Sequence, residues 1–126
     1  FQDDPTFILR RFVQLVVKGA EDHKSLAVRL YQSIPAAGLG GLNAGLNLLD
    51  TLDTRIALKT FAGPQLHVLG ARDELVPATQ ADALTALVPG AEIQVLDNAC
   101  HALPLQFPEQ LADIMAGFIT RKRGLG

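Results

Sequence analysis

The chain has 126 residues, of which 48% are hydrophobic, and its formal net charge is −2 at pH 7. This composition is typical of a globular domain with a sizeable core, and it gives no general attraction to nucleic acid or to an anionic membrane surface. No apolar run approaches the roughly 20 residues of a membrane-spanning helix, and no signal segment opens the sequence, so we expect a cytoplasmic protein. The one cysteine excludes an internal disulfide.

Residues 1 to 52 carry a helical pattern. Pro5 is suited to the first turn of a helix, and apolar residues follow it at spacings of three and four. A second helix is predicted from about residue 22 to residue 33. A third helix is predicted on a stripe of leucines, namely Leu39, Leu42, Leu46 and Leu49.

After Asp53 the pattern changes to alternating strands and helices. We predict a helical turn over residues 54–60, a strand over 65–69 and a helix over 79–88. A second strand follows over 92–96, and a final helix begins at Pro108. Such a strand-helix-strand-helix unit makes neighbouring parallel strands, so the fold class is α/β. The closing Arg121-Lys122-Arg123 is expected to be a solvated tail.

Two strands are too few for a stable parallel sheet that is covered on both faces. The sequence also begins at Phe1 rather than at a methionine. We therefore expect these residues to be a fragment, whose missing N-terminal half supplies the other strands.

Each predicted strand is followed by a side chain of catalytic type. Asp73 comes four residues after the first strand, and His101 comes five residues after the second. The carboxyl ends of parallel strands meet at the edge of the sheet where ligand sites lie. A carboxylate that holds one imidazole nitrogen makes the other a useful base for a serine nucleophile. We therefore predict that Asp73 and His101 are the acid and base of a hydrolase triad, although each alone could be only a turn former or a structural histidine.

Other reactive residues favour structural roles. Ser25 and Ser33 lie on a predicted helix and not in a Gly-x-Ser-x-Gly elbow, so the nucleophile is expected outside this chain. Cys100 is predicted to be a small buried side chain rather than a partner of His101, and His67 a hydrogen-bonded residue of the core. The sequence has no glycine-rich phosphate loop and no cluster of metal ligands, so we expect neither a cofactor nor a metal.

Residues 53 to 120 resemble the carboxyl-terminal part of the α/β-hydrolase superfamily. In that superfamily Gly-x-x-Asp-x-x-Val-Pro follows the strand before the triad acid, and a loop ending in His-Ala precedes the last helix. The matching positions are Gly70, Asp73, Val76, Pro77, His101, Ala102 and Pro108. The resemblance implies a partial α/β-hydrolase fold, with residues 1 to 52 as a helical cap, or lid, and residues 53 to 126 as the C-terminal part of the core.

The cap segment is similar to that of the pimeloyl-acyl-carrier-protein methyl ester esterases, a family of carboxylesterases of biotin biosynthesis. The likeness rests on Arg-Phe-Val-Gln-Leu at residues 11–15 and on Gly-Leu-Asn-Ala-Gly-Leu at residues 41–46. By this resemblance the first cap helix lines the acyl pocket through Phe12, Val13, Gln14, Leu15 and Val16. The structural alternative for the apolar members of this set is plain packing of the cap on the core.

The same resemblance implies a carrier-binding surface and a function. Arg11, Lys24 and Arg29 would bind an acidic acyl-carrier protein that bears a pimeloyl methyl ester, although Arg11 could be only a solvated charge. The chain would belong to a serine carboxylesterase that hydrolyses this ester, and the fragment alone would be inactive. The alternatives are another α/β-hydrolase chemistry, acting on a lactone, an epoxide or a carbon–carbon bond, and a non-catalytic binding module, since one fold hosts many functions.

Overall fold

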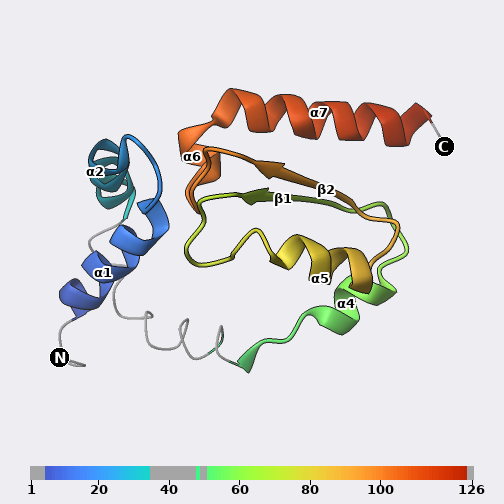
Figure 1. Cartoon of the computed structure of the whole chain (residues 1–126), viewed down its shortest axis with the longest axis horizontal. Helices are drawn as coiled ribbons and strands as arrows, with labels where there is room; N and C mark the ends of the chain where they lie inside the picture. The colour runs from blue at the N-terminus through green and yellow to red at the C-terminus, as the bar shows by residue number, and fades with distance from the viewer. Residues whose placement is uncertain (1–4, 35–47, 49–50, 125–126) are drawn as a thin grey trace.

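A computed structural model describes residues 5–34, 48 and 51–124 of the chain (Figure 1). The helix predicted on Leu39, Leu42, Leu46 and Leu49 lies outside these residues. The elements, in chain order, are α1 Pro5–Val17, α2 His23–Ser33, α4 Arg55–Thr60, β1 Leu66–Gly70, α5 Gln80–Leu87, β2 Glu92–Leu96, α6 Leu103–Gln106 and α7 Pro108–Gly124.

Every other predicted element is confirmed to within one or two residues, and one element was not predicted. That element is α6, a single helical turn between the base-bearing loop and α7. Pro104 lies in its first turn, where the missing N–H of proline costs no intrahelical hydrogen bond. Such a short turn buries too little periodic apolar sequence to be seen as a helical pattern.

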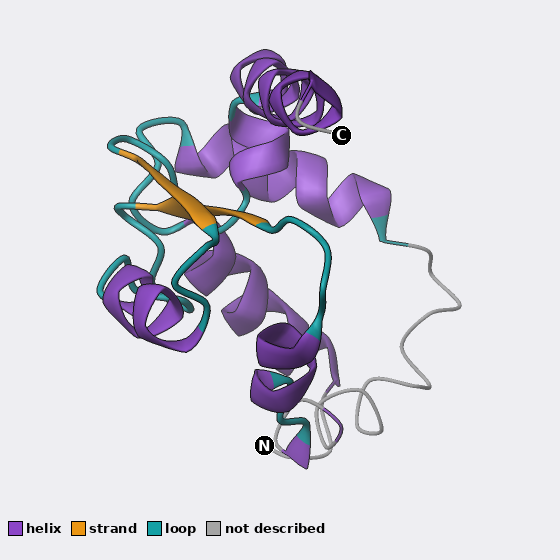
Figure 2. Cartoon of the chain, turned by 90° about the vertical axis from the view of Figure 1, so that its right-hand side faces the viewer, coloured by secondary structure: helices purple, strands orange, loops and turns teal. Residues whose placement is uncertain are grey.

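The two strands are parallel and pair in register from Leu66 opposite Glu92 to Gly70 opposite Leu96. The chain crosses between them through α5. Helix α7 lies on one side of the strands, and α4 and α5 lie on the other (Figures 1 and 2). The α/β fold class is therefore confirmed, with the sheet as the middle layer.

The helix pair α1–α2 lies beyond the carboxyl ends of both strands (Figure 1). Its inner face forms one buried cluster with residues of the loop after β2, namely Val13, Val16, Val17, Ala20, Leu26, Ala27, Cys100 and Ala102. A second cluster joins β2 to α6 and α7 through the buried Leu96, Ala99 and Leu103. The core of the molecule therefore surrounds the loop that carries His101.

The basic run near the end of the chain is not a tail. Arg121, Lys122 and Arg123 form the last turn of α7, and Arg121 Nη2 donates to Glu92 Oε2 at 2.6 Å. Basic side chains there also suit the partial negative charge of a helix C-terminus. Among the described residues, no helix has the length and hydropathy needed to cross a membrane.

Candidate active site

The loop after β1, residues 71–79 and here called the acid loop, holds the Asp73 carboxylate from two sides. Its Oδ1 accepts hydrogen bonds from the backbone N–H groups of Leu75 and Val76, both at 2.8 Å. Its Oδ2 lies 2.8 Å from Nδ1 of His101. Only 8% of the side chain is exposed. The carboxylate is thus fixed by its own turn and points one oxygen at the imidazole.

The loop after β2, residues 97–102 and here called the base loop, presents His101 between two buried residues. Cys100 and Ala102 both belong to the cluster under α1 and α2, whereas 39% of the His101 side chain is exposed. A histidine whose Nδ1–H is held by a carboxylate keeps Nε2 as the basic nitrogen, on the far side of the ring. The expected meeting of Asp73 and His101 is therefore confirmed as a contact, and their catalytic role stays a prediction.

Backbone hydrogen bonds join the acid loop to the base loop. The N–H of Ala71 donates to the Leu96 carbonyl, and the N–H of Arg72 donates to the Ala99 carbonyl, both at 2.9 Å. At Gly70 a Cβ atom would collide with the Ala99 carbonyl, so a side chain there would force the two loops apart. This close approach brings the Asp73 carboxylate within reach of the imidazole.

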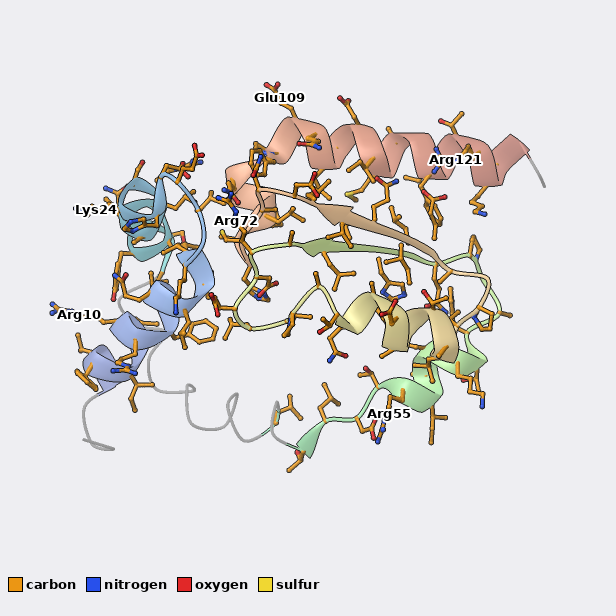
Figure 3. The ribbon with its side chains drawn as sticks, viewed as in Figure 1. Arg10, Lys24, Arg55, Arg72, Glu109 and Arg121 are labelled. Atoms are coloured by element: carbon orange, nitrogen blue, oxygen red, sulfur yellow. The ribbon has the colours of Figure 1, made fainter. Side chains whose placement is uncertain are left out.

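The turn between α1 and α2 presses against the acid loop at Gly19. Gly19 has a φ of 94°, and a Cβ on it would lie 2.6 Å from the Arg72 carbonyl oxygen. Arg72 Nη1 donates to the Gly19 carbonyl at 3.3 Å, and Figure 3 places Arg72 between the helix pair and the strand ends. Lys18 Nζ and Glu74 Oε1 add a weak ion pair at 3.9 Å. The helix pair is therefore tied directly to the loop that carries Asp73.

An apolar hollow of about 430 Å³ opens between the helix pair and the base loop. Its lining includes Phe12, Val13 and Val16 of the predicted acyl-pocket residues, together with His101 and Pro104. Val13 and Val16 also belong to the buried core, so packing and lining are not exclusive at these positions. The structure thus brings the imidazole to the wall of an apolar space.

The other two predicted pocket residues, Gln14 and Leu15, line a different hollow of about 770 Å³ on the outer side of α1. A helix turns about 100° per residue, so five consecutive positions cannot all face one side. This outer hollow is basic, and its charged lining residues are Arg10, Arg11 and Lys18.

The three residues expected to bind a carrier do not share one hollow. Arg11 lines the outer hollow, whereas Lys24 and Arg29 lie exposed on α2. In Figure 3 the labelled Arg10 and Lys24 both point away from the body of the molecule. These two cations of the helix pair therefore face outward, away from the strands.

The other reactive side chains considered in the sequence, Cys100, His67 and Ser33, are buried or hydrogen-bonded to neighbouring residues. Cys100 is fully buried, and burial raises the pKa of its thiol, so it is not a ready nucleophile. In β1, His67 Nε2 lies 3.0 Å from Oε1 of Gln65, the residue before the strand, and the Ser33 hydroxyl donates to the Leu30 carbonyl at 2.7 Å. No group of three or more metal-ligating side chains gathers in the described part of the chain.

Sequence reasoning did not single out Gly19 or Gln106. A glycine in sequence indicates only a possible helix end, and the contact of Gly19 with Arg72 crosses 53 positions of sequence. Gln106 bridges two backbone groups of the base loop, and a lone glutamine in sequence gives no signal of such a role.

No family model matches the chain, but curated proteins do. The chain is 35% identical over 115 residues to the pimeloyl-acyl-carrier protein methyl ester esterase of Xanthomonas campestris pv. campestris, an alignment that covers 89% of the chain and 46% of that protein. The esterase of the same name from Edwardsiella ictaluri is 36% identical over 122 residues, with 93% and 46% covered. The biotin biosynthesis bifunctional protein BioHC of Teredinibacter turnerae is 29% identical over 125 residues, with 97% and 22% covered. The chain thus spans less than half the length of each of these relatives.

Proposed function

Since the chain is homologous to pimeloyl-acyl-carrier protein methyl ester esterases and is part of an α/β-hydrolase, we propose that it supplies the acid and the base of a serine carboxylesterase. The observation that supports this most is the 2.8 Å contact between Asp73 Oδ2 and His101 Nδ1. This contact leaves Nε2 as the proton acceptor, as the mechanism of a serine esterase requires.

In the proposed first step, His101 Nε2 takes the proton of a serine hydroxyl as the serine oxygen bonds to the ester carbonyl carbon. The tetrahedral intermediate then collapses, the bond to methoxide breaks, and His101 gives its proton to the methoxide, which leaves as methanol. In the second step His101 takes a proton from water as the water oxygen bonds to the carbonyl carbon of the acyl-serine. The bond to the serine oxygen then breaks, His101 returns its proton to that oxygen, and the free acid leaves. Asp73 orients the ring and stabilises the imidazolium throughout.

The nucleophile of this mechanism lies outside the 126 residues. Neither Ser25 nor Ser33 lies in a Gly-x-Ser-x-Gly segment, and the oxyanion hole is usually formed next to that serine and in an earlier loop. We place both in an N-terminal half of the same protein, which would also extend the β1–β2 sheet. These 126 residues alone would then be inactive.

The apolar hollow is the proposed site of the acyl chain. Its volume of about 430 Å³ falls in the range of roughly 300–1,000 Å³ that is usual for small-molecule sites. Phe12, Val13 and Val16 would contact the methylenes, and the ester carbonyl would lie beside His101. In this proposal residues 1 to 52 are the cap and residues 53 to 126 belong to the hydrolase core.

The outward-facing positive charges are the proposed contact with the carrier protein. Arg11, Lys24 and Arg29 are exposed on α1 and α2, and exposed cations attract an acidic partner and speed its association. Arg10 and Lys18 add to this charge from the outer hollow. With such a carrier as the substrate, we propose that the reaction takes place in the cytoplasm.

The test is product analysis on the protein as its gene encodes it. We expect release of methanol and free acid from pimeloyl-acyl-carrier protein methyl ester in preference to a simple aryl ester, and loss of both activities in His101→Ala. A protein that opens a lactone or an epoxide but leaves the methyl ester intact would contradict the proposed substrate. A protein that binds the carrier but hydrolyses nothing would identify a binding module instead.

A further inference from the structure

We propose that Gln106 is a positioning residue for His101, and that its side-chain amide holds the base loop in the conformation that presents the imidazole to Asp73. This inference rests on the proposed function only for its kinetic consequence. Gln106 ends α6 and does not touch His101 through any hydrogen bond given by the structure, so it would act through the loop backbone.

The amide of Gln106 makes two hydrogen bonds of opposite sense. Its Oε1 accepts from the backbone N–H of Cys100 at 2.9 Å, and its Nε2 donates to the Asn98 carbonyl at 3.1 Å. Because one partner is a donor and the other an acceptor, only one orientation of the amide satisfies both. The side chain therefore fits this loop in a way that an apolar or a charged residue of similar length does not.

These bonds complete the support of a loop that has no strand partner. The Ala99 carbonyl, between the two groups held by Gln106, accepts instead from the N–H of Arg72 in the acid loop. The base loop is thus bonded from α6 on one side and from the acid loop on the other. Gln106 is itself fixed, because its N–H donates to the Ala102 carbonyl at 2.9 Å.

The position of His101 depends on this backbone support more than on its own side-chain contacts. The imidazole is 39% exposed, and among the described residues its side-chain hydrogen bond is to Asp73. Without the Gln106 side chain, two backbone groups before His101 lose their hydrogen-bond partner, namely the Asn98 carbonyl and the Cys100 N–H. A displacement of about 1 Å at a catalytic group is enough to lower turnover by roughly a hundredfold.

The experiment replaces Gln106 by methionine, which has a similar length and cannot make either bond, in the protein as its gene encodes it. We expect kcat for ester hydrolysis to fall by about tenfold to a hundredfold, with KM changed less than about twofold. The low-field proton resonance of the His101 Nδ1–H, which reports the bond to Asp73, should broaden or move upfield. Gln110→Met, on an exposed position of α7, is the matched control and should change neither.

Gln106→Glu keeps the acceptor for Cys100 and loses the donor to Asn98, so we expect an intermediate loss of kcat. It also serves if the methionine variant does not fold. A folded Gln106→Met or Gln106→Glu protein that keeps both the wild-type kcat and the wild-type Nδ1–H resonance would overturn the proposal, even if its melting temperature were lower. The resonance can be measured without substrate, so the two proposals can fail separately. If the wild-type protein hydrolyses no ester but the resonance changes in Gln106→Met, the proposed function is contradicted and the positioning role is supported.

Discussion

The two ends of the β1–β2 layer differ in how they are held. At the carboxyl ends of the strands, the acid loop, the base loop and the helix pair meet through backbone hydrogen bonds and a buried cluster. At the other end, two exposed ion pairs, Glu92 with Arg121 and Asp53 with Arg55, accompany a backbone hydrogen bond from the N–H of Glu92 to the Gln65 carbonyl. Helices α5 and α7 contain no fully buried residue.

This difference shows where the described residues fix geometry. Buried backbone bonds and close packing resist displacement, whereas an exposed ion pair contributes little because water screens it and its long side chains lose entropy. The end with the dense contacts is the end that carries Asp73 and His101. On the outer surface, Val95 of β2 and Met115 and Ile119 of α7 are exposed.

The largest effect on stability is expected at Gly19, where the helix pair meets the acid loop. Gly19→Ala should lower the free energy of unfolding by about 1–3 kcal/mol, because alanine is strained at a φ of 94° and its Cβ would collide with Arg72. Urea denaturation of the encoded protein measures this loss.

The matched control for that substitution is Gly90→Ala, after α5. A Cβ at Gly90 would meet no atom within 4 Å, so we expect a change of a few tenths of a kcal/mol at most, in either direction. Equal losses in the two variants would mean that the site end is no more tightly packed than the rest, and the comparison would fail.

The smallest effect is expected at the exposed pair of Asp53 and Arg55. Hydrogen bonding to Arg55 lowers the pKa of Asp53 from 3.8 to about 2. Since the folded pKa is lowered, the pair stabilises the fold above roughly pH 4, and this contribution is lost as the pH falls toward about 2. Asp53→Asn should therefore lower stability slightly at neutral pH, where the pair contributes, and leave it unchanged near pH 2, so that the profile between the two is flatter.

Thermal midpoints between pH 2 and pH 7 measure that profile, with Asp113→Asn on α7 as an exposed control. A large loss of stability at pH 7 in Asp53→Asn would mean that the surface pair matters as much as the buried contacts. It would then remove the contrast between the two ends of the layer.

The strands and the two polar residues that follow them could be predicted from the sequence, because both depend on local patterns. The apolar segments of strand length end before Gly70 and after Leu96, and parallel strands bring the residues that follow them to one edge. The contact of Asp73 with His101 therefore needed only spacing and topology. The helix start at Pro5 was equally local.

Other features depend on which distant segments meet, and local pattern does not contain that information. The amide of Gln106 finds its partners only once the base loop is folded back on α6. Arg121 was predicted to be solvated, because its partner Glu92 lies 29 positions away in sequence and is brought to it only by the packing of α7. Residues 12–16 line two different hollows because of the direction in which α1 packs. The periodicity of the sequence predicts an apolar face on this helix, but not what that face packs against.

A double-mutant cycle on Asp73 and His101 tests the central claim, that these two residues act as one acid–base unit, most directly. The measurement is kcat/KM of the encoded protein for the methyl ester, in Asp73→Asn, His101→Ala and the double variant. We predict that each single change lowers kcat/KM by about a thousandfold or more, and that the double variant is within a few-fold of His101→Ala. Losses that multiply in the double variant, or wild-type kcat/KM in either single variant, would contradict the account.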